Sequence, residues 1–282
     1  MANFNIEYYS NCLHRAASFK VVIPGVDRRM DSFPPQELTE IQKGEMKTLF
    51  LLHGYTGKGD CWVPEYLCDQ YNFAVVCPNG ENGFWLNGRS TGHKFQSLVG
   101  EELVDFMRKT FKLATKPENT YIMGLSMGGF GALHTALAYP DVFSKACCLS
   151  SALIHHEVAN MKAPGTAGAG EASKGANEDG GNGVANYDYY RECFGELEKL
   201  LQSENNPEYL VEKILASGGK IKMPEIIMAC GTEDFLLNEN RAMHKFLEEK
   251  GVKHVYWEDS GIHDMNFWGK CVQKFIPEMF GK

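Results

Sequence analysis

The sequence predicts an α/β fold in which helices cover both faces of a mainly parallel β-sheet. Short apolar runs, typical of buried strands, alternate along the chain with amphipathic stretches of helical spacing. One such run, at residues 120–125, passes through a glycine-rich turn directly into a helical pattern. With 282 residues, of which 44% are hydrophobic, the chain is long and apolar enough to bury a substantial core.

The individual elements follow from the same patterns. Strands are expected at residues 19–23, 47–53, 72–77, 120–125, 144–150, 225–230 and 254–257. Helices are expected at residues 97–113, directly after the glycine-rich turn, and at residues 238–250 and 264–276. The run at 47–53 is continuously apolar, as expected of a strand that is buried on both faces of a parallel sheet.

We expect one domain over residues 1–282, because the alternation of strands and helices continues on both sides of a single irregular stretch. That stretch, residues 163–186, holds seven glycines and no aromatic residue. It cannot bury enough surface to offset its ordering entropy, so we expect a flexible insertion. It acts either as a lid or as a passive loop. Residues 187–217 look helical and are expected to form a cap segment beside the site.

Composition excludes several classes of function. The net charge is −8 and no basic block is present, so neither nucleic acid nor an anionic membrane is an expected partner. From the N-terminal residues no signal peptide is expected, and no apolar stretch of the sequence is long enough to span a bilayer. The nine cysteines contain no C-x-x-C pair, which favours reduced thiols and a cytoplasmic protein over a zinc or disulfide site.

The most informative motif is the run Gly-Leu-Ser-Met-Gly at residues 124–128. This G-x-S-x-G pattern places a serine on a bend too tight for larger neighbours, which exposes its hydroxyl at the end of the sheet. The strand pattern before it and the helical pattern after it are the setting that the motif requires. We therefore predict that Ser126 is a nucleophile, the alternative being a glycine-rich turn with an incidental serine.

A serine nucleophile needs a base and an orienting carboxylate, and both follow later strands. Asp234 lies in the loop after strand 225–230, and His263 lies in the loop after strand 254–257. The order serine, acid, histidine is that of an α/β-hydrolase. Glu233 is the competing acid, and Asp234 is preferred for its position in the motif.

Other titratable groups receive ordinary roles. Asp259 and Asp264 flank His263 too closely along the chain to orient it, so they are expected to be cap or surface charges. The run His155-His156-Glu157 resembles a metal cluster only superficially. Adjacent histidines on a strand face opposite sides, and no spaced third ligand follows, so no metal site is predicted.

Acyl transfer also needs donors for a developing oxyanion. The strand at 47–53 ends in a His53-Gly54 turn, where a hydrolase supplies one backbone N–H from the next residue. The second donor is the residue that follows the nucleophile. We therefore predict the backbone N–H groups of Tyr55 and Met127 as the oxyanion hole. The side chains of Tyr55 and Trp85 are predicted to bind substrate, with packing in the core as the alternative.

Together these motifs resemble a known family. The pattern His53-Gly54-x-x-Gly57, the serine motif, Gly231-x-x-Asp234 and Gly261-x-His263 are similar to the esterase D group of α/β-hydrolases. The likeness is closest to tributyrin-esterase-type bacterial carboxylesterases, which are related to S-formylglutathione hydrolases and to feruloyl and acetyl-xylan esterases. The resemblance implies hydrolysis of short-chain acyl esters through an acyl-enzyme, with no cofactor. The glycine-rich stretch at 163–186 departs from the family.

Alternatives to a simple carboxylesterase stay open at this point. Feruloyl or acetyl-xylan esterases act on carbohydrate-linked esters, and a peptidase or acyltransferase would use the same three residues. An S-formylglutathione thioesterase would need a basic rim, for which only Lys58, Arg89 and Lys94 are available. A catalytically inactive binding module on the same fold is the non-enzymatic alternative. The substrate is expected to be a small ester, and the sequence leaves homo-oligomer formation open.

Overall fold

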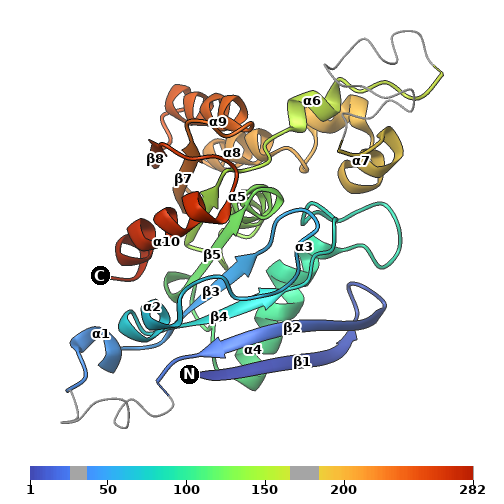
Figure 1. Ribbon diagram of the computed structural model, residues 1–282. Coiled ribbons are helices and arrows are strands. Elements are labelled where there is room, and N and C mark those ends of the chain that lie inside the picture. The colour runs from blue at the N-terminus through green and yellow to red at the C-terminus, as the bar shows by residue number, and fades with distance from the viewer. Residues whose placement is uncertain (26–36, 166–183, 282) are drawn as a thin grey trace.

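The computed structural model describes residues 1–25, 37–165 and 184–281 (Figure 1). Eight strands form one sheet in the order β1-β2-β4-β3-β5-β6-β7-β8. The strands are β1 (Ala2–Ser10), β2 (Arg15–Ile23), β3 (Lys47–Leu52), β4 (Phe73–Pro78), β5 (Thr120–Leu125), β6 (Lys145–Leu149), β7 (Glu225–Gly231) and β8 (His254–Asp259). The expected strands are all present, which confirms the α/β prediction.

The sheet is parallel except at one edge. β1 pairs antiparallel with β2, and β2 pairs antiparallel with β4, whereas the pairs from β4 through β8 are parallel. The register between β3 and β5 aligns Thr48 with Thr120 and Leu52 with Gly124. The carboxyl ends of β3, β5, β6, β7 and β8 therefore meet at one edge of the sheet, where ligand sites form in folds of this class.

Helices cover both faces of the sheet and bury two separate apolar clusters. One face packs on α2 and α10, which contribute Leu67 and Phe275 to a fully buried cluster. The other face packs on α4, α5, α8 and α9. The bounds are α1 (Glu40–Lys43), α2 (Glu65–Gln70), α3 (Phe95–Ser97), η1 (Leu98–Glu102), α4 (Leu103–Thr110), η2 (Pro117–Asn119), α5 (Met127–Ala138), α6 (His155–Ala159), α7 (Tyr187–Phe194), η3 (Leu197–Gln202), α8 (Pro207–Ala216), α9 (Leu237–Glu249) and α10 (Met265–Phe280).

Two segments differ from the sequence prediction. β1 was not expected, because it contains no apolar run; its side chains alternate between exposed and half-buried along an edge of the sheet. The helical pattern at 187–217 is divided into α7, η3 and α8. In Figure 1, α6 and α7 lie beyond the end of the sheet towards which the parallel strands point.

The domain prediction stays a proposal. We propose that residues 1–282 form one domain, since all eight strands belong to a single sheet. The predicted insertion at 163–186 falls mostly on residues 166–183, which lie outside the described residues. Within residues 1–25, 37–165 and 184–281, no helix has both the length and the apolar character needed to cross a bilayer.

Candidate active site

Ser126 occupies a sharp bend between β5 and α5. Its backbone has φ 56° and ψ −120°, a conformation that costs a non-glycine residue about 1–3 kcal/mol. The bend is held by the Ser126 N–H, which donates to the Leu149 carbonyl at 2.9 Å. The flanking glycines are required by close packing. A Cβ atom on Gly124 would lie 2.1 Å from the Gly128 carbonyl oxygen, and one on Gly128 would lie 2.3 Å from that of Leu52.

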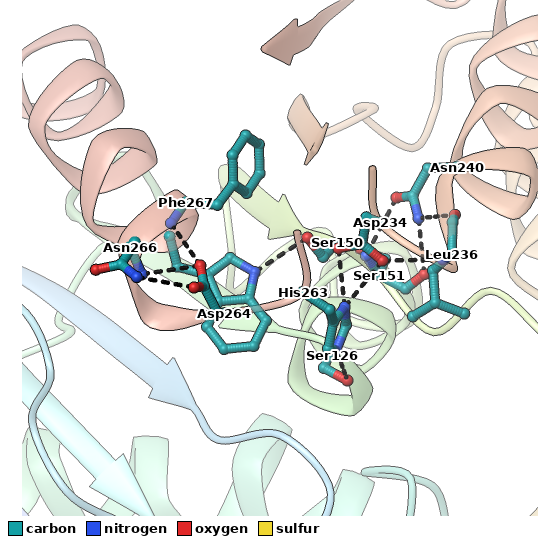
Figure 2. Close-up of polar contacts among 11 residues, drawn as sticks. Ser126, Ser150, Ser151, Asp234, Leu236, Asn240, His263, Asp264, Asn266 and Phe267 are labelled. Carbon is teal, nitrogen blue, oxygen red and sulfur yellow. Dashed lines mark hydrogen bonds and ion pairs between the residues drawn. The ribbon is translucent and has the colours of Figure 1, made fainter. Parts of the chain in front are cut away.

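The structure brings Ser126, His263 and Asp234 together from three distant stretches of chain (Figure 2). His263 Nε2 lies 2.9 Å from Ser126 Oγ, and His263 Nδ1 lies 3.0 and 2.9 Å from the two Asp234 carboxylate oxygens. An ionised carboxylate only accepts, so Nδ1 carries the proton and Nε2 is free to accept one from Ser126. Glu233 is exposed and instead binds the backbone N–H of Gly261, so it does not contact His263.

The surroundings of Asp234 keep its carboxyl group ionised. Burial raises the pKa of Asp234, but hydrogen bonds from His263, the Leu236 N–H and the Ser150 hydroxyl outweigh this, and the net effect lowers it. The Leu236 N–H donates to Asp234 Oδ1 at 2.9 Å. A carboxylate that is both buried and ionised can fix the orientation of the neighbouring imidazole and stabilise its positive charge.

Several supporting residues were not found from the sequence. Trp268 Nε1 donates to Ser150 Oγ at 3.0 Å, and the Trp268 ring packs edge-on against His263. The buried Asn240 on α9 accepts from the Ser151 N–H and donates to the Ser151 carbonyl (Figure 2). These bonds fix the loop after β6 beside Asp234. The available signal was the position of Ser150 and Ser151 at the end of a predicted strand, at the edge where sites form.

The two aspartates that flank His263 have the roles expected of them. Asp264 is the N-cap of α10 and accepts from the backbone N–H groups of Asn266 and Phe267, both at 3.0 Å (Figure 2). The Asp259 carboxylate lies 3.7 Å from Lys270 Nζ in a surface ion pair. Capping at Asp264 anchors the start of α10 immediately after His263.

The His53-Gly54 turn packs directly against the serine bend. A Cβ atom on Gly54 would lie 2.9 Å from a Leu125 methyl carbon and 3.3 Å from Ser126 Cβ. His53 is buried; its Nε2 accepts from the Gly80 N–H at 3.0 Å, so its Nδ1 donates to the Gly54 carbonyl at 2.8 Å. Burial lowers the pKa of His53 and keeps it neutral. The two hydrogen bonds of the His53 imidazole therefore fix the conformation of the His53-Gly54 turn.

The structure does not support substrate binding by Trp85. Its side chain is fully buried, and its Nε1 donates to the His53 carbonyl at 3.1 Å. The ring also fills the space beside Gly80 and Gly131, where an added Cβ would lie 2.6 and 2.5 Å away. Trp85 thus packs behind the His53-Gly54 turn, which is the core role given as its alternative.

A cavity of about 330 Å³ opens in front of Ser126 and His263. Its apolar walls are formed by Tyr55, Trp62, Leu125, Met265 and Trp268. Tyr55 therefore lines the cavity, and substrate binding by its side chain stays a prediction. The volume is at the lower end of the range for ligand pockets, which is about 300–1,000 Å³. The site can hold a small acyl group beside the serine hydroxyl.

A second group of titratable side chains lies apart from this cavity. His155 and His156 are on helix α6, not on a strand as the sequence analysis assumed, and their ring centroids are only 4.6 Å apart. Glu208, at the start of α8, lies beside both. The third side chain of the group therefore comes from a distant segment and is not Glu157, which sequence spacing alone does not reveal.

Comparison with known proteins identifies the family. Residues 42–270 match the family model described as "Putative esterase". The chain belongs to this esterase family. It is 38% identical over 276 residues to an acetyl esterase of Caldicellulosiruptor saccharolyticus, with 96% of each sequence covered. The protein is thus a carboxylic ester hydrolase of the serine esterase class.

Solved structures agree with the fold of this esterase. An S-formylglutathione hydrolase from Staphylococcus aureus superposes with a TM-score of 0.75 at 22% identity, covering 99% of this chain and 98% of that chain. A ferulic acid esterase from Anaeromyces mucronatus superposes with a TM-score of 0.60 at 17% identity, covering 99% and 91%. Both likenesses establish the α/β-hydrolase fold and confirm that part of the prediction.

Proposed function

We propose that Ser126, His263 and Asp234 form the catalytic triad of this esterase. His263 Nε2 takes the Ser126 proton as Ser126 Oγ attacks the ester carbonyl carbon. His263 then gives this proton to the leaving alcohol as the ester bond breaks, which leaves an acyl-enzyme. A water molecule, activated by His263 in the same way, releases the acid and restores Ser126. The continuous series of contacts at 2.9–3.0 Å supports these roles.

We propose the backbone N–H groups of Tyr55 and Met127 as the oxyanion hole. Met127 is the first residue of α5, where a backbone N–H has no acceptor within the helix. The close packing of Gly54 on Ser126 brings the Tyr55 segment to the same point. Two such donors directed at the developing negative charge are worth about 3 kcal/mol each in the transition state.

Short acyl esters are the substrates that this site suits best. The small, apolar cavity beside Ser126 has room for an acetyl or similar group, and tryptophan rings limit its extension. The relative at 38% identity is an acetyl esterase, which agrees with this choice. We propose that α7 forms the cap predicted from the sequence, because its Tyr189 ring packs edge-on against Tyr55 at the cavity entrance.

The charges near the site disfavour a glutathione thioester as the main substrate. Its two carboxylates would need free basic groups. Lys58 at the cavity pairs with Asp60 at 3.0 Å, and Arg89 pairs with Glu196 at 3.5 Å. Lys94 donates to the Gly88 carbonyl. Of these three bases only Lys58 lines the cavity, which is too little positive charge for two carboxylates, so an uncharged small ester fits the site better.

Two measurements test the proposal. Replacing Ser126→Ala removes the nucleophile and should lower kcat for p-nitrophenyl acetate by roughly 10⁴- to 10⁶-fold. Replacing Ser144→Ala, a serine on the amino-terminal side of β6, should leave the rate unchanged and serves as the control. A Ser126→Ala enzyme that keeps most of its rate would overturn the triad.

A series of esters from acetate to octanoate, with methyl ferulate added, tests the substrate class. We expect kcat/KM to be highest for acetate or propionate and to fall as the acyl chain outgrows the cavity. A maximum at octanoate or methyl ferulate would contradict the short-acyl assignment while leaving the triad intact.

A further inference from the structure

The side chains of His155, His156 and Glu208 converge on one point outside the catalytic site. His156 Nε2 lies 3.0 Å from Glu208 Oε1, and His155 Nε2 lies 3.6 Å from the same oxygen. One ligand-type atom from each residue can be chosen so that all lie within 4.8 Å of one another. These residues come from α6 and from the start of α8, two helices that are separated by about 50 residues of chain.

Two of the three separations between these atoms are close to those around a small tetrahedral cation. A zinc ion with bonds of about 2.0–2.1 Å to nitrogen and oxygen holds its ligand atoms about 3.3 Å apart. The separations of 3.0 and 3.6 Å lie on either side of that value. Both separations lie within ion-pair distance, but only His156 is close enough to Glu208 for a hydrogen bond; the 3.6 Å between His155 and Glu208 is too long for one.

His155 supplies an independent indication of a ligand. Its side chain is only 2% exposed, and neither ring nitrogen has a hydrogen-bond partner within the described residues. Leaving a buried polar group unpaired is costly, so such a group calls for an occupant. Its Nε2 is directed towards Glu208, which places an open lone pair at the centre of the cluster.

Hydrogen bonds within the protein already hold the backbone around the cluster before any ion binds. The Asn206 side chain caps α8 and accepts from the Glu208 N–H at 3.0 Å, with Pro207 at the first helical position. On α6, the His156 carbonyl accepts from the Asn160 side chain at 2.9 Å. Backbone that is already held by such hydrogen bonds loses little further entropy when its side chains bind an ion, which favours affinity.

We propose that His155, His156 and Glu208 bind a zinc ion that ties α6 to α8. Two imidazole nitrogens and one carboxylate oxygen suit zinc among the common divalent ions, whereas calcium and magnesium prefer oxygen ligands throughout. His156 is half-exposed, so water has access to the fourth position. The site lies outside the Ser126 machinery, and its role is to stabilise the two helices. Zinc is therefore expected to raise the melting temperature without being needed for ester hydrolysis.

The test is zinc titration of the tag-free, chelator-treated enzyme by calorimetry. We expect one saturable zinc ion per chain, and we expect His156→Gln and Glu208→Gln each to weaken binding by about tenfold or more. Glu157→Gln is the matched control, because this carboxylate lies next to the histidine pair but outside the cluster. Its zinc affinity should equal that of the wild type.

Cobalt provides a second measurement that does not depend on mutant stability. The chain has nine free cysteines, which offer zinc a competing binding mode. Cobalt bound to His155, His156 and Glu208 should give the visible bands of a tetrahedral site without the ultraviolet thiolate band. A thiolate band at one equivalent, no saturable zinc binding, or unchanged affinity in both ligand variants would overturn the proposal.

Discussion

The two histidine sites of this esterase differ in how completely their nitrogens are satisfied. Both nitrogens of His263 have partners, one on Ser126 and one on Asp234. Neither nitrogen of His155 has a hydrogen-bond partner within the described residues, although Glu208 is close by. In the first arrangement, Nε2 can accept the Ser126 proton while Asp234 holds the proton on Nδ1. In the second, a cation bound to Nε2 of His155 would satisfy one of its two unpaired nitrogens, which is why similar side chains are assigned different chemistry.

After loss of the Ser126 nucleophile, the largest effect expected at the first site is the loss of the Asp234 carboxylate. Asp234→Asn keeps the shape but no longer fixes the His263 tautomer, so kcat/KM for p-nitrophenyl acetate should fall by roughly 10³- to 10⁴-fold. Steady-state kinetics on the purified variant provides the measurement. Glu233→Gln is the matched control and should retain wild-type kinetics. Equal losses in the two variants would show that the neighbouring acid shares the role.

A third histidine extends the comparison to stability. His134 is fully buried, and its Nε2–H donates to the Glu204 carbonyl at 2.7 Å. Burial lowers the pKa of His134 to about 4. Above its unfolded pKa of about 6.5, the imidazole is neutral in both states and has no effect. As the pH falls towards 4, only the unfolded chain takes up the proton, so folding should lose about 3 kcal/mol of stability.

Urea unfolding between pH 7 and pH 4 measures this effect. The wild type should lose stability over that range, and His134→Gln should lose distinctly less, whatever its stability at pH 7. Identical pH dependence in the two proteins would show that other groups cause the acid sensitivity.

A smaller effect, on the stability of the fold, is expected from replacing Trp85, whose ring packs behind the His53-Gly54 turn. Trp85→Phe removes the donor to the His53 carbonyl and should lower the free energy of unfolding by about 1–2 kcal/mol. Chemical denaturation gives the value, and Trp62→Phe is the matched control. The Trp62 Nε1 has no hydrogen-bond partner in the described chain, so that variant loses no bond. A larger loss for Trp62→Phe would contradict the account of Trp85.

The catalytic contacts were predictable because each residue type is tied to a local pattern. The glycines of the G-x-S-x-G motif identify Ser126, and Asp234 and His263 each follow a recognisable strand. Since parallel strands end at one edge, their side chains could be expected to meet there. The preference for Asp234 over Glu233 agrees with the contact to His263, although what keeps Glu233 away is its bond to the Gly261 N–H, a detail that spacing does not contain.

What escaped prediction depends on contacts between distant segments or on weak patterns. Glu208 reaches the histidine pair only because α8 packs near α6. Trp85 could not be assigned between core and pocket, because an aromatic residue suits both. β1 was missed because an edge strand with one exposed face needs only weak alternation, with Ile6 and Tyr8 as its half-buried positions.

The close packing of Gly124 and Gly128 limits the evolution of this enzyme. Both positions face backbone atoms at distances that no added methyl group can tolerate, whereas Gly269 on α10 has open space around it. Drift in sequence can therefore accumulate on the outer helices while the bend stays unchanged. Substitutions at residues such as Met265 and Tyr55, whose side chains line the cavity, can change its shape without disturbing the bend.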